Sequence, residues 1–150
     1  MIKNEKSIMI HRPIEEVFAF VGALQNGPRW QPGLLEVRRT TEGPLGIGTQ
    51  FTSVRKFLGQ KMEAGVELTA YEPSRKVAFR SIAGSMPLEG SYLFEATAEG
   101  TRLTAVIAMQ PGGFMGLAAP LMAASLRREM DTNFSDLKLL LENRTAAASS

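Results

Sequence analysis

Hydrophobic and polar residues alternate through the middle of the chain, as they do in strands that bury one face. The alternation is clearest over residues 61–71, where one face carries Met62, Ala64, Val66, Leu68 and Ala70. Shorter runs of the same kind occupy residues 35–38, 49–58, 76–81, 92–96 and 102–109. Turn residues such as Gly59-Gln60, Glu72-Pro73-Ser74 and Glu99-Gly100 separate the runs. The pattern predicts an antiparallel meander with one wet face and one buried face.

The N-terminal part of the chain has a different pattern. A short strand at residues 7–11 leads to Pro13, which suits the first turn of a helix because its missing N–H has no intrahelical partner there. Ile14, Val17, Phe18 and Val21 then recur at helical spacing. Gly22 is a typical stop, and a second helical turn is expected in the broken segment 23–32.

The C-terminal part predicts one long helix over residues 114–143, about 45 Å in length. Its second half is amphipathic, with a stripe formed by Leu126, Met130, Phe134, Leu137 and Leu141. Its first half is apolar on nearly every side, and Pro120 is expected to kink it near Gly116. Residues 1–144 are read as a single domain, and the small, polar residues 145–150 as a flexible tail.

These elements together favour an α+β fold. A curved antiparallel sheet of about seven strands would wrap around the long C-terminal helix, with two short helices after the first strand. A helix is only about 10–12 Å across, so a strongly curved sheet leaves space beside it. That space is the candidate site. The expected ligand-binding positions are Trp30, Phe51, Arg55, Met62, Phe79, Tyr92, Leu103, Met109, Phe114, Leu117 and Leu121.

The order of several segments resembles one known superfamily. The segments are HRPIEEVFAFV, LQNGPRWQPG, GPLGIGTQF, LTAYEPSRKVAF, YLFEATAEGTRLT and the closing FSDLKLLLE. They are similar to those of the START/Bet v 1-like helix-grip proteins (SRPBCC), specifically the bacterial polyketide cyclase/dehydrase and lipid-transport-like group. The resemblance spans nearly the whole chain and implies the helix-grip fold with a hydrophobic-ligand cavity. It implies no single chemistry, since members include cyclases, dehydratases, lipid carriers and binders.

Composition and charge exclude several classes of function. Basic residues exceed acidic ones by only two and are scattered, so nucleic-acid binding is not expected. There are no cysteines, and the single histidine, His11, has no metal-ligand spacing around it, so neither a metal nor another cofactor is expected. The absence of cysteine fits a cytoplasmic location. The mostly apolar stretch 114–126 is shorter than the roughly 20 residues that span a bilayer, so stable membrane insertion is not expected.

Two residues could carry chemistry in the predicted cavity. Strict alternation from Phe51 places Arg55 on the inward face, where its guanidinium would need a ligand carboxylate or a glutamate. A slipped register or an edge strand would instead leave Arg55 in water, which is the commoner environment of arginine. Tyr92 could offer its hydroxyl to a ligand as a donor or weak acid, although a buried core tyrosine is the commoner reading.

Three functions stay open from the sequence. The first is binding of a small hydrophobic molecule, such as a lipid, an aromatic or a polyketide-like compound. The second is a cyclase or dehydratase acting in the same cavity, with Arg55 and Tyr92 as catalytic candidates. The third is a protein-interaction module, or a homodimer, that uses the apolar start of the last helix as its contact.

Overall fold

A computed structural model describes residues 2–57, 59–84, 87–110 and 119–148. The elements follow the predicted order: β1 (Ile2–Ile10), α1 (Ile14–Val21), η1 (Leu24–Arg29), β2 (Leu34–Arg39), β3 (Gln50–Phe57), β4 (Gln60–Glu72), β5 (Lys76–Gly84), β6 (Leu88–Thr97), β7 (Gly100–Met109) and α2 (Ala119–Ala148). The α+β prediction, with seven strands and two short early helices, is confirmed.

All seven strands form one antiparallel sheet in the order β1-β7-β6-β5-β4-β3-β2. The first strand is longer than predicted, since Ile2 pairs with Met109 and Ile10 with Thr101. Strands β2 to β7 follow one another as a meander, and the last strand closes back on the first. The chain therefore begins at one edge of the sheet and reaches the other edge at β2.

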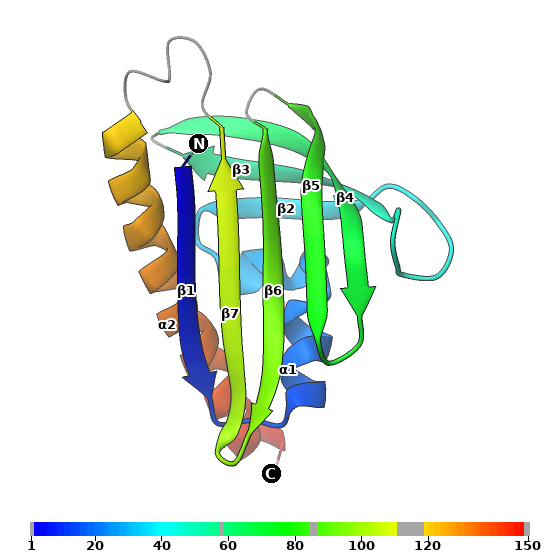
Figure 1. Ribbon diagram of the computed structural model, residues 1–150, viewed down its shortest axis with the longest axis vertical. Coiled ribbons are helices and arrows are strands. Elements are labelled where there is room, and N and C mark those ends of the chain that lie inside the picture. Colours follow the sequence, from blue (N-terminus) through cyan, green and yellow to red (C-terminus); the bar gives the residue numbers. More distant parts are fainter. Residues whose placement is uncertain (1, 58, 85–86, 111–118, 149–150) are drawn as a thin grey trace.

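Strong curvature distinguishes the two ends of the sheet. In Figure 1, β1, β7 and β6 run along the long axis, whereas β2 and β3 run across it behind their upper half. Register shifts occur between β2 and β3 and twice between β4 and β5. Such bulges bend a strand and increase its twist.

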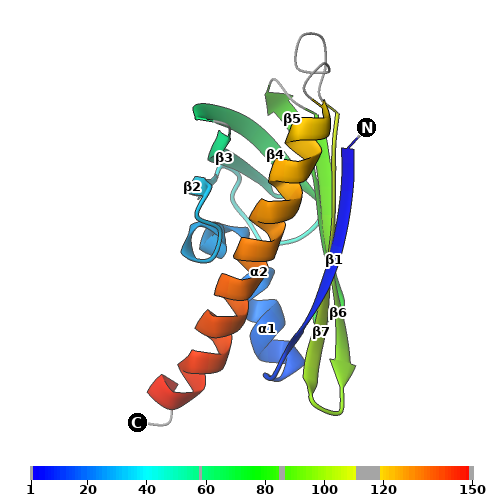
Figure 2. The same ribbon diagram turned by 90° about the vertical axis from the view of Figure 1, so that its left-hand side faces the viewer.

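Helix α2 lies in the concavity of the curled sheet (Figure 2), and its nearest strand is β1. The expected helix start at Phe114, the Leu117 position and the kink near Gly116 lie outside the described residues. The described helix continues to Ala148, beyond the expected end near residue 143, and the flexibility of residues 145–150 stays a prediction. Pro120 stands in the first turn of the described helix, where it is well tolerated.

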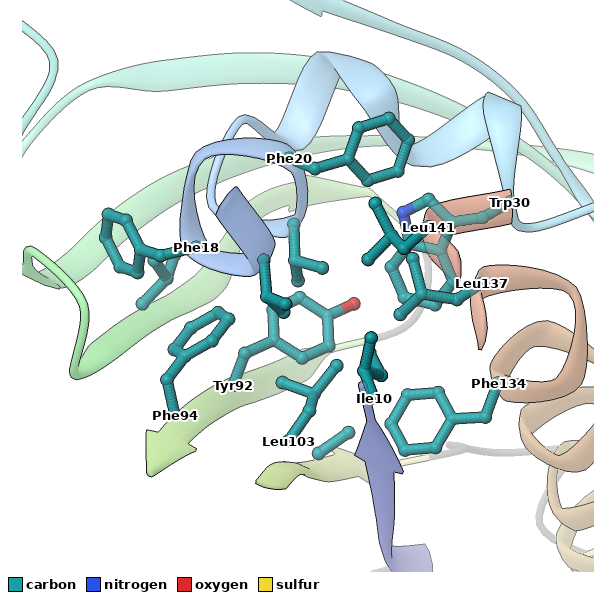
Figure 3. Packing of buried hydrophobic residues seen from close by; sticks show 14 of the residues in the cluster. Ile10, Phe18, Phe20, Trp30, Tyr92, Phe94, Leu103, Phe134, Leu137 and Leu141 are labelled. Atoms are coloured by element: carbon teal, nitrogen blue, oxygen red, sulfur yellow. The ribbon is translucent and has the colours of Figure 1, made fainter. Parts of the chain in front are cut away.

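Two groups of buried side chains hold the helix and sheet together. The larger lies around α1 and the C-terminal half of α2 (Figure 3) and includes Phe18, Trp30, Phe134, Leu137 and Leu141. The smaller lies at the opposite end of the helix and consists of Ile2, Met109, Met122 and Leu126. Between the two groups the packing is interrupted, and the candidate site is found there.

Candidate functional site

A cavity separates the sheet from the middle of α2. About 80 Å³ is open to the centre of a water molecule, and the whole empty space, including its mouth, is about 620 Å³. A cavity needs roughly 10–15 Å³ of space open to the centre of a water molecule to hold one water, so this cavity has room for several waters or a small guest. The lining residues are Asn4, Trp30, Gln31, Arg55, Phe79, Leu88, Tyr92, Ala105, Ile107, Met109, Leu126, Glu129, Met130, Asn133 and Phe134.

The helix supplies one wall from a single face. Leu126, Glu129, Met130, Asn133 and Phe134 recur at intervals of three and four residues, which places them above one another on α2. Two of these five positions carry polar side chains. The apolar stripe of α2 therefore includes polar side chains where it meets the cavity.

The sheet supplies the opposite wall from β5, β6 and β7. Phe79 and Ile107 flank Gly90, their common neighbour in register. A Cβ atom at Gly90 would lie 2.6 Å from Phe79 Cζ and 2.7 Å from Ile107 Cδ1. Glycine at this position leaves the space into which both side chains extend over the sheet.

Four aromatic rings surround the cavity. The ring of Tyr92 lies 6.0 Å from Trp30 and 5.9 Å from Phe79 between centroids, with interplanar angles of 60° and 49°. Trp30 also lies 6.3 Å from Phe134. Tilted contacts at these distances are the favourable arrangement of aromatic pairs. The aromatic rings therefore form walls that suit a flat apolar guest.

An ion pair crosses the cavity. Arg55 Nη1 of β3 donates a hydrogen bond of 2.8 Å to Glu129 Oε1 of α2, and the two side chains are 26% and 19% exposed. Arg55 Nη2 makes a longer contact of 3.5 Å with Gln31 Oε1. The guanidinium therefore has the glutamate partner that an inward arginine requires.

Tyr92 stands beside this ion pair as a neutral phenol. Burial raises its pKa from 10.0 to about 12, although the charge of Arg55 and a side-chain hydrogen bond with Gln31 lower it in part. The tyrosine therefore holds its proton in the cavity wall, next to Gln31 and Arg55.

Asn133 is the third polar residue of this region. Its side chain lines the cavity and the residue is only 8% exposed. Its Oδ1 atom is buried and has no hydrogen-bond partner among the residues that the structure describes. Buried amide oxygens are nearly always paired, so this acceptor is unusual.

The structure brings together part of the predicted set on the cavity wall: Trp30, Arg55, Phe79, Tyr92 and Met109. Phe51 and Leu103 are instead fully enclosed in the core, and Met62 packs against the smaller hydrophobic cluster. Leu121 is 57% exposed, so its expected place in the cavity is wrong. Helical phase explains the error, because Leu121 precedes the inward Met122 by one residue.

Sequence reasoning missed the polar residues of the helix wall. Glu129 and Asn133 occur between Leu126, Met130 and Phe134, at positions that belong to the same apolar stripe. Polar residues within such a stripe were the available signal. Gln31 had no comparable signal, since it follows Trp30 in an irregular segment.

The sequence predicted neither a metal site at His11 nor a helix that spans a membrane, and the structure bears on both points only for the described residues. His11 is exposed, and its Nδ1 lies 3.3 Å from the backbone oxygen of Glu99, at the rim of the sheet. Among the described residues no group of acidic or histidine side chains could hold a metal ion. Within that same part of the chain, no helix combines the length and the apolar character needed to cross a bilayer.

Comparison with known families gives a match over residues 1–142 to the model described as polyketide cyclase/dehydrase and lipid transport. No curated protein sequence matches significantly. The fold is similar to that of a Thermus thermophilus protein, TTHA0849, at 22% identity and a TM-score of 0.78, with 99% of both chains covered.

Two further structures are similar. The Zhui aromatase/cyclase from a Streptomyces species has 15% identity and a TM-score of 0.79, with 97% of this chain and 96% of that chain covered. A START superfamily protein from Mycobacterium smegmatis has 13% identity and a TM-score of 0.74, with 94% and 97% covered. At these identities the likeness is one of fold.

Proposed function

Because this chain belongs to the polyketide cyclase/dehydrase and lipid transport family, we propose that it binds a small hydrophobic molecule in the cavity beside α2. One observation carries the proposal. The cavity interrupts an otherwise continuous core and is walled by aromatic and aliphatic side chains, with a few polar groups among them. This combination is typical of sites that take up an apolar ligand and orient it.

Native mass spectrometry of the purified protein tests for a co-purified apolar compound. A thermal-shift panel of lipids and aromatic compounds tests binding directly, because a ligand selective for the folded state stabilises it by about 2.7 kcal/mol at a hundredfold excess over Kd. For a domain of this length the melting temperature would rise by about 5–10 °C. No shift for any compound, and no co-purified molecule, would contradict the proposal.

A cavity-filling variant makes the test specific to this site. Ala105 lies on the cavity wall and is 1% exposed, so Ala105→Leu would occupy the space meant for a guest. The same substitution at the exposed Ala83 is the matched control. We expect Ala105→Leu to abolish the ligand-induced shift and Ala83→Leu to preserve it. Equal shifts in both variants would place binding elsewhere.

A second candidate function is catalysis of the cyclase or dehydratase type in the same cavity. It is favoured because Arg55 and Tyr92 both line the cavity. The Arg55 cation could stabilise an enolate-like oxygen, and the Tyr92 phenol could donate a proton. The similarity to an aromatase/cyclase agrees with this idea at the level of fold. If Arg55→Ala and Tyr92→Phe both leave turnover of a substrate unchanged, the assignment of these residues is wrong.

The apolar helix start that suggested an interaction module begins at residue 114, and residues 114–118 lie outside the described residues. Association into a homodimer and a cytoplasmic location stay predictions of the sequence. Size-exclusion chromatography with light scattering measures the first of them.

A further inference from the structure

The described lining of the cavity has no net charge. Arg55 and Glu129 are the charged residues among its described lining, and they are joined to each other at 2.8 Å. A carboxylate guest would have to displace Glu129 from the guanidinium or be enclosed beside a like charge, and both are unfavourable. A neutral polar group faces neither penalty.

The cavity wall contains a hydrogen-bond acceptor without a partner among the described residues. Asn133 lines the cavity with a side chain whose Oδ1 is buried and unpaired within the described residues, so a turn of the amide toward a guest that donates a hydrogen bond would satisfy it. Tyr92 is neutral and already shares a side-chain hydrogen bond with Gln31. A hydroxyl group is the simplest neutral group that donates a hydrogen bond to the free acceptor.

The remaining walls favour a flat hydrocarbon body. Trp30, Phe79, Tyr92 and Phe134 surround the cavity with tilted ring contacts. A planar aromatic guest can continue that arrangement by edge-to-face contact.

Resting on the proposed binding function, we propose that this cavity selects a neutral aromatic alcohol, of the phenol or naphthol class, over the corresponding carboxylate. Asn133 accepts the hydrogen bond of its hydroxyl. Glu129 confers the selection against carboxylates by occupying Arg55.

Titration calorimetry with four matched probes tests the inference: naphthalene, methoxynaphthalene, naphthol and naphthoate, substituted at the same ring position. We expect naphthol to bind about tenfold more tightly than naphthalene, which is the change that one well-formed hydrogen bond produces. Methoxynaphthalene, which accepts but does not donate, should fall near naphthalene, and naphthoate should bind most weakly. Naphthoate binding as tightly as naphthol would overturn the inference.

Two variants assign the selectivity to residues. Asn133→Leu removes the acceptor and should reduce naphthol to the affinity of naphthalene, whereas Thr132→Leu on the exposed side of the same helix should leave the ratio unchanged. Glu129→Gln releases Arg55 from its ion pair and should raise naphthoate affinity about tenfold. Retention of the naphthol preference in Asn133→Leu, or no gain for naphthoate in Glu129→Gln, would contradict the corresponding role.

The outcomes separate this inference from the function on which it rests. If all four probes bind with equal affinity, the cavity binds apolar guests and the selection by Asn133 and Glu129 is wrong. If none binds, the binding function itself fails and the inference with it.

Discussion

Helix α2 meets the sheet in two different ways along its length. From Leu137 to Leu141 its inward side chains are enclosed by the core, whereas from Leu126 to Phe134 they stand beside a cavity. Both regions follow the same helical stripe. They differ in side-chain chemistry, because Leu137 and Leu141 fill their space while Glu129 and Asn133 bring polar groups to theirs.

The difference shows how one helix can both stabilise a fold and provide a site. Apolar side chains at the C-terminal half anchor the helix to α1 and the sheet, so the middle need not contribute as much packing. The cost of an unfilled region is offset by the well-packed one. The comparison predicts that the two regions respond differently to the same kind of substitution.

The largest expected effect concerns the packed region. Leu137 is fully buried, and Leu137→Ala should reduce the free energy of unfolding by about 2–5 kcal/mol, because it leaves a new void among enclosed neighbours. Met130 lines a cavity that already exists, so Met130→Ala should cost about 1 kcal/mol. Urea denaturation measures both. Equal losses would show that the middle of the helix is packed as tightly as its end.

The next effect is a loss of stability at alkaline pH that comes from Tyr92, a residue of the cavity wall. Tyr92 has its pKa raised to about 12 by burial, whereas the unfolded chain releases the proton near 10. The unfolded state therefore binds fewer protons between these values, and stability falls as pH rises through them, by about 2–3 kcal/mol in total.

Tyr92→Phe removes this contribution. Urea titrations of both proteins between pH 9 and about pH 12 should show a steeper loss of stability for the native sequence. Lysine residues titrate in the same range but are common to both proteins, so the difference between the two curves belongs to Tyr92. Parallel curves would mean that the phenol is exposed to water.

Much of the fold was predictable because alternation and helical periodicity are local signals. The run at residues 61–71 identified β4, and the spacing of Ile14, Val17, Phe18 and Val21 identified α1. Alternation from Phe51 offered an inward position for Arg55 beside the commoner exposed one, and in the structure Arg55 lines the cavity. The fold class followed from the order of these elements and from the family resemblance.

The site was less predictable because it depends on relations between distant residues. The sequence pattern predicted that Phe51 and Leu103 point inward. The curvature and bulges of the sheet decide whether an inward side chain lines the cavity or packs in the core. Likewise the Arg55–Glu129 pair joins residues 74 positions apart. Their ligand-binding roles remain predictions.

A smaller effect is expected for the ion pair. Arg55→Met and Glu129→Met should each destabilise the fold by about 1–2 kcal/mol, because each leaves one partly buried charge without its partner; residual exposure keeps the loss below that of a fully buried pair. The double variant should recover most of the lost stability. A double-mutant cycle by chemical denaturation measures the coupling. Additive losses in the double variant would show that the two residues act independently.

The smallest expected effect comes from Gly33, which makes room for the ion pair. A Cβ atom there would lie 2.8 Å from Glu129 Oε1 and 3.3 Å from the backbone oxygen of Lys56. The closer contact is with the end of a flexible side chain, so Gly33→Ala should change stability by less than about 1 kcal/mol while moving the carboxylate away from Arg55. Naphthoate should then bind about two- to threefold more tightly than to the native protein, a fraction of the gain expected for Glu129→Gln.

Gly46→Ala is the matched control, because a Cβ atom at Gly46 would meet nothing within 4 Å. It carries the same change in unfolded-state entropy without touching the cavity, so it should alter neither naphthoate nor naphthol affinity. Calorimetry on the two alanine variants thus isolates the position of the Glu129 carboxylate from any general effect of replacing glycine. If Gly33→Ala leaves naphthoate affinity unchanged although Glu129→Gln raises it, the carboxylate keeps its contact with Arg55 despite the methyl group. The close approach at Gly33 would then be a feature of packing alone, and selection against carboxylates would depend on the charge of Glu129 and not on the space that glycine leaves for it.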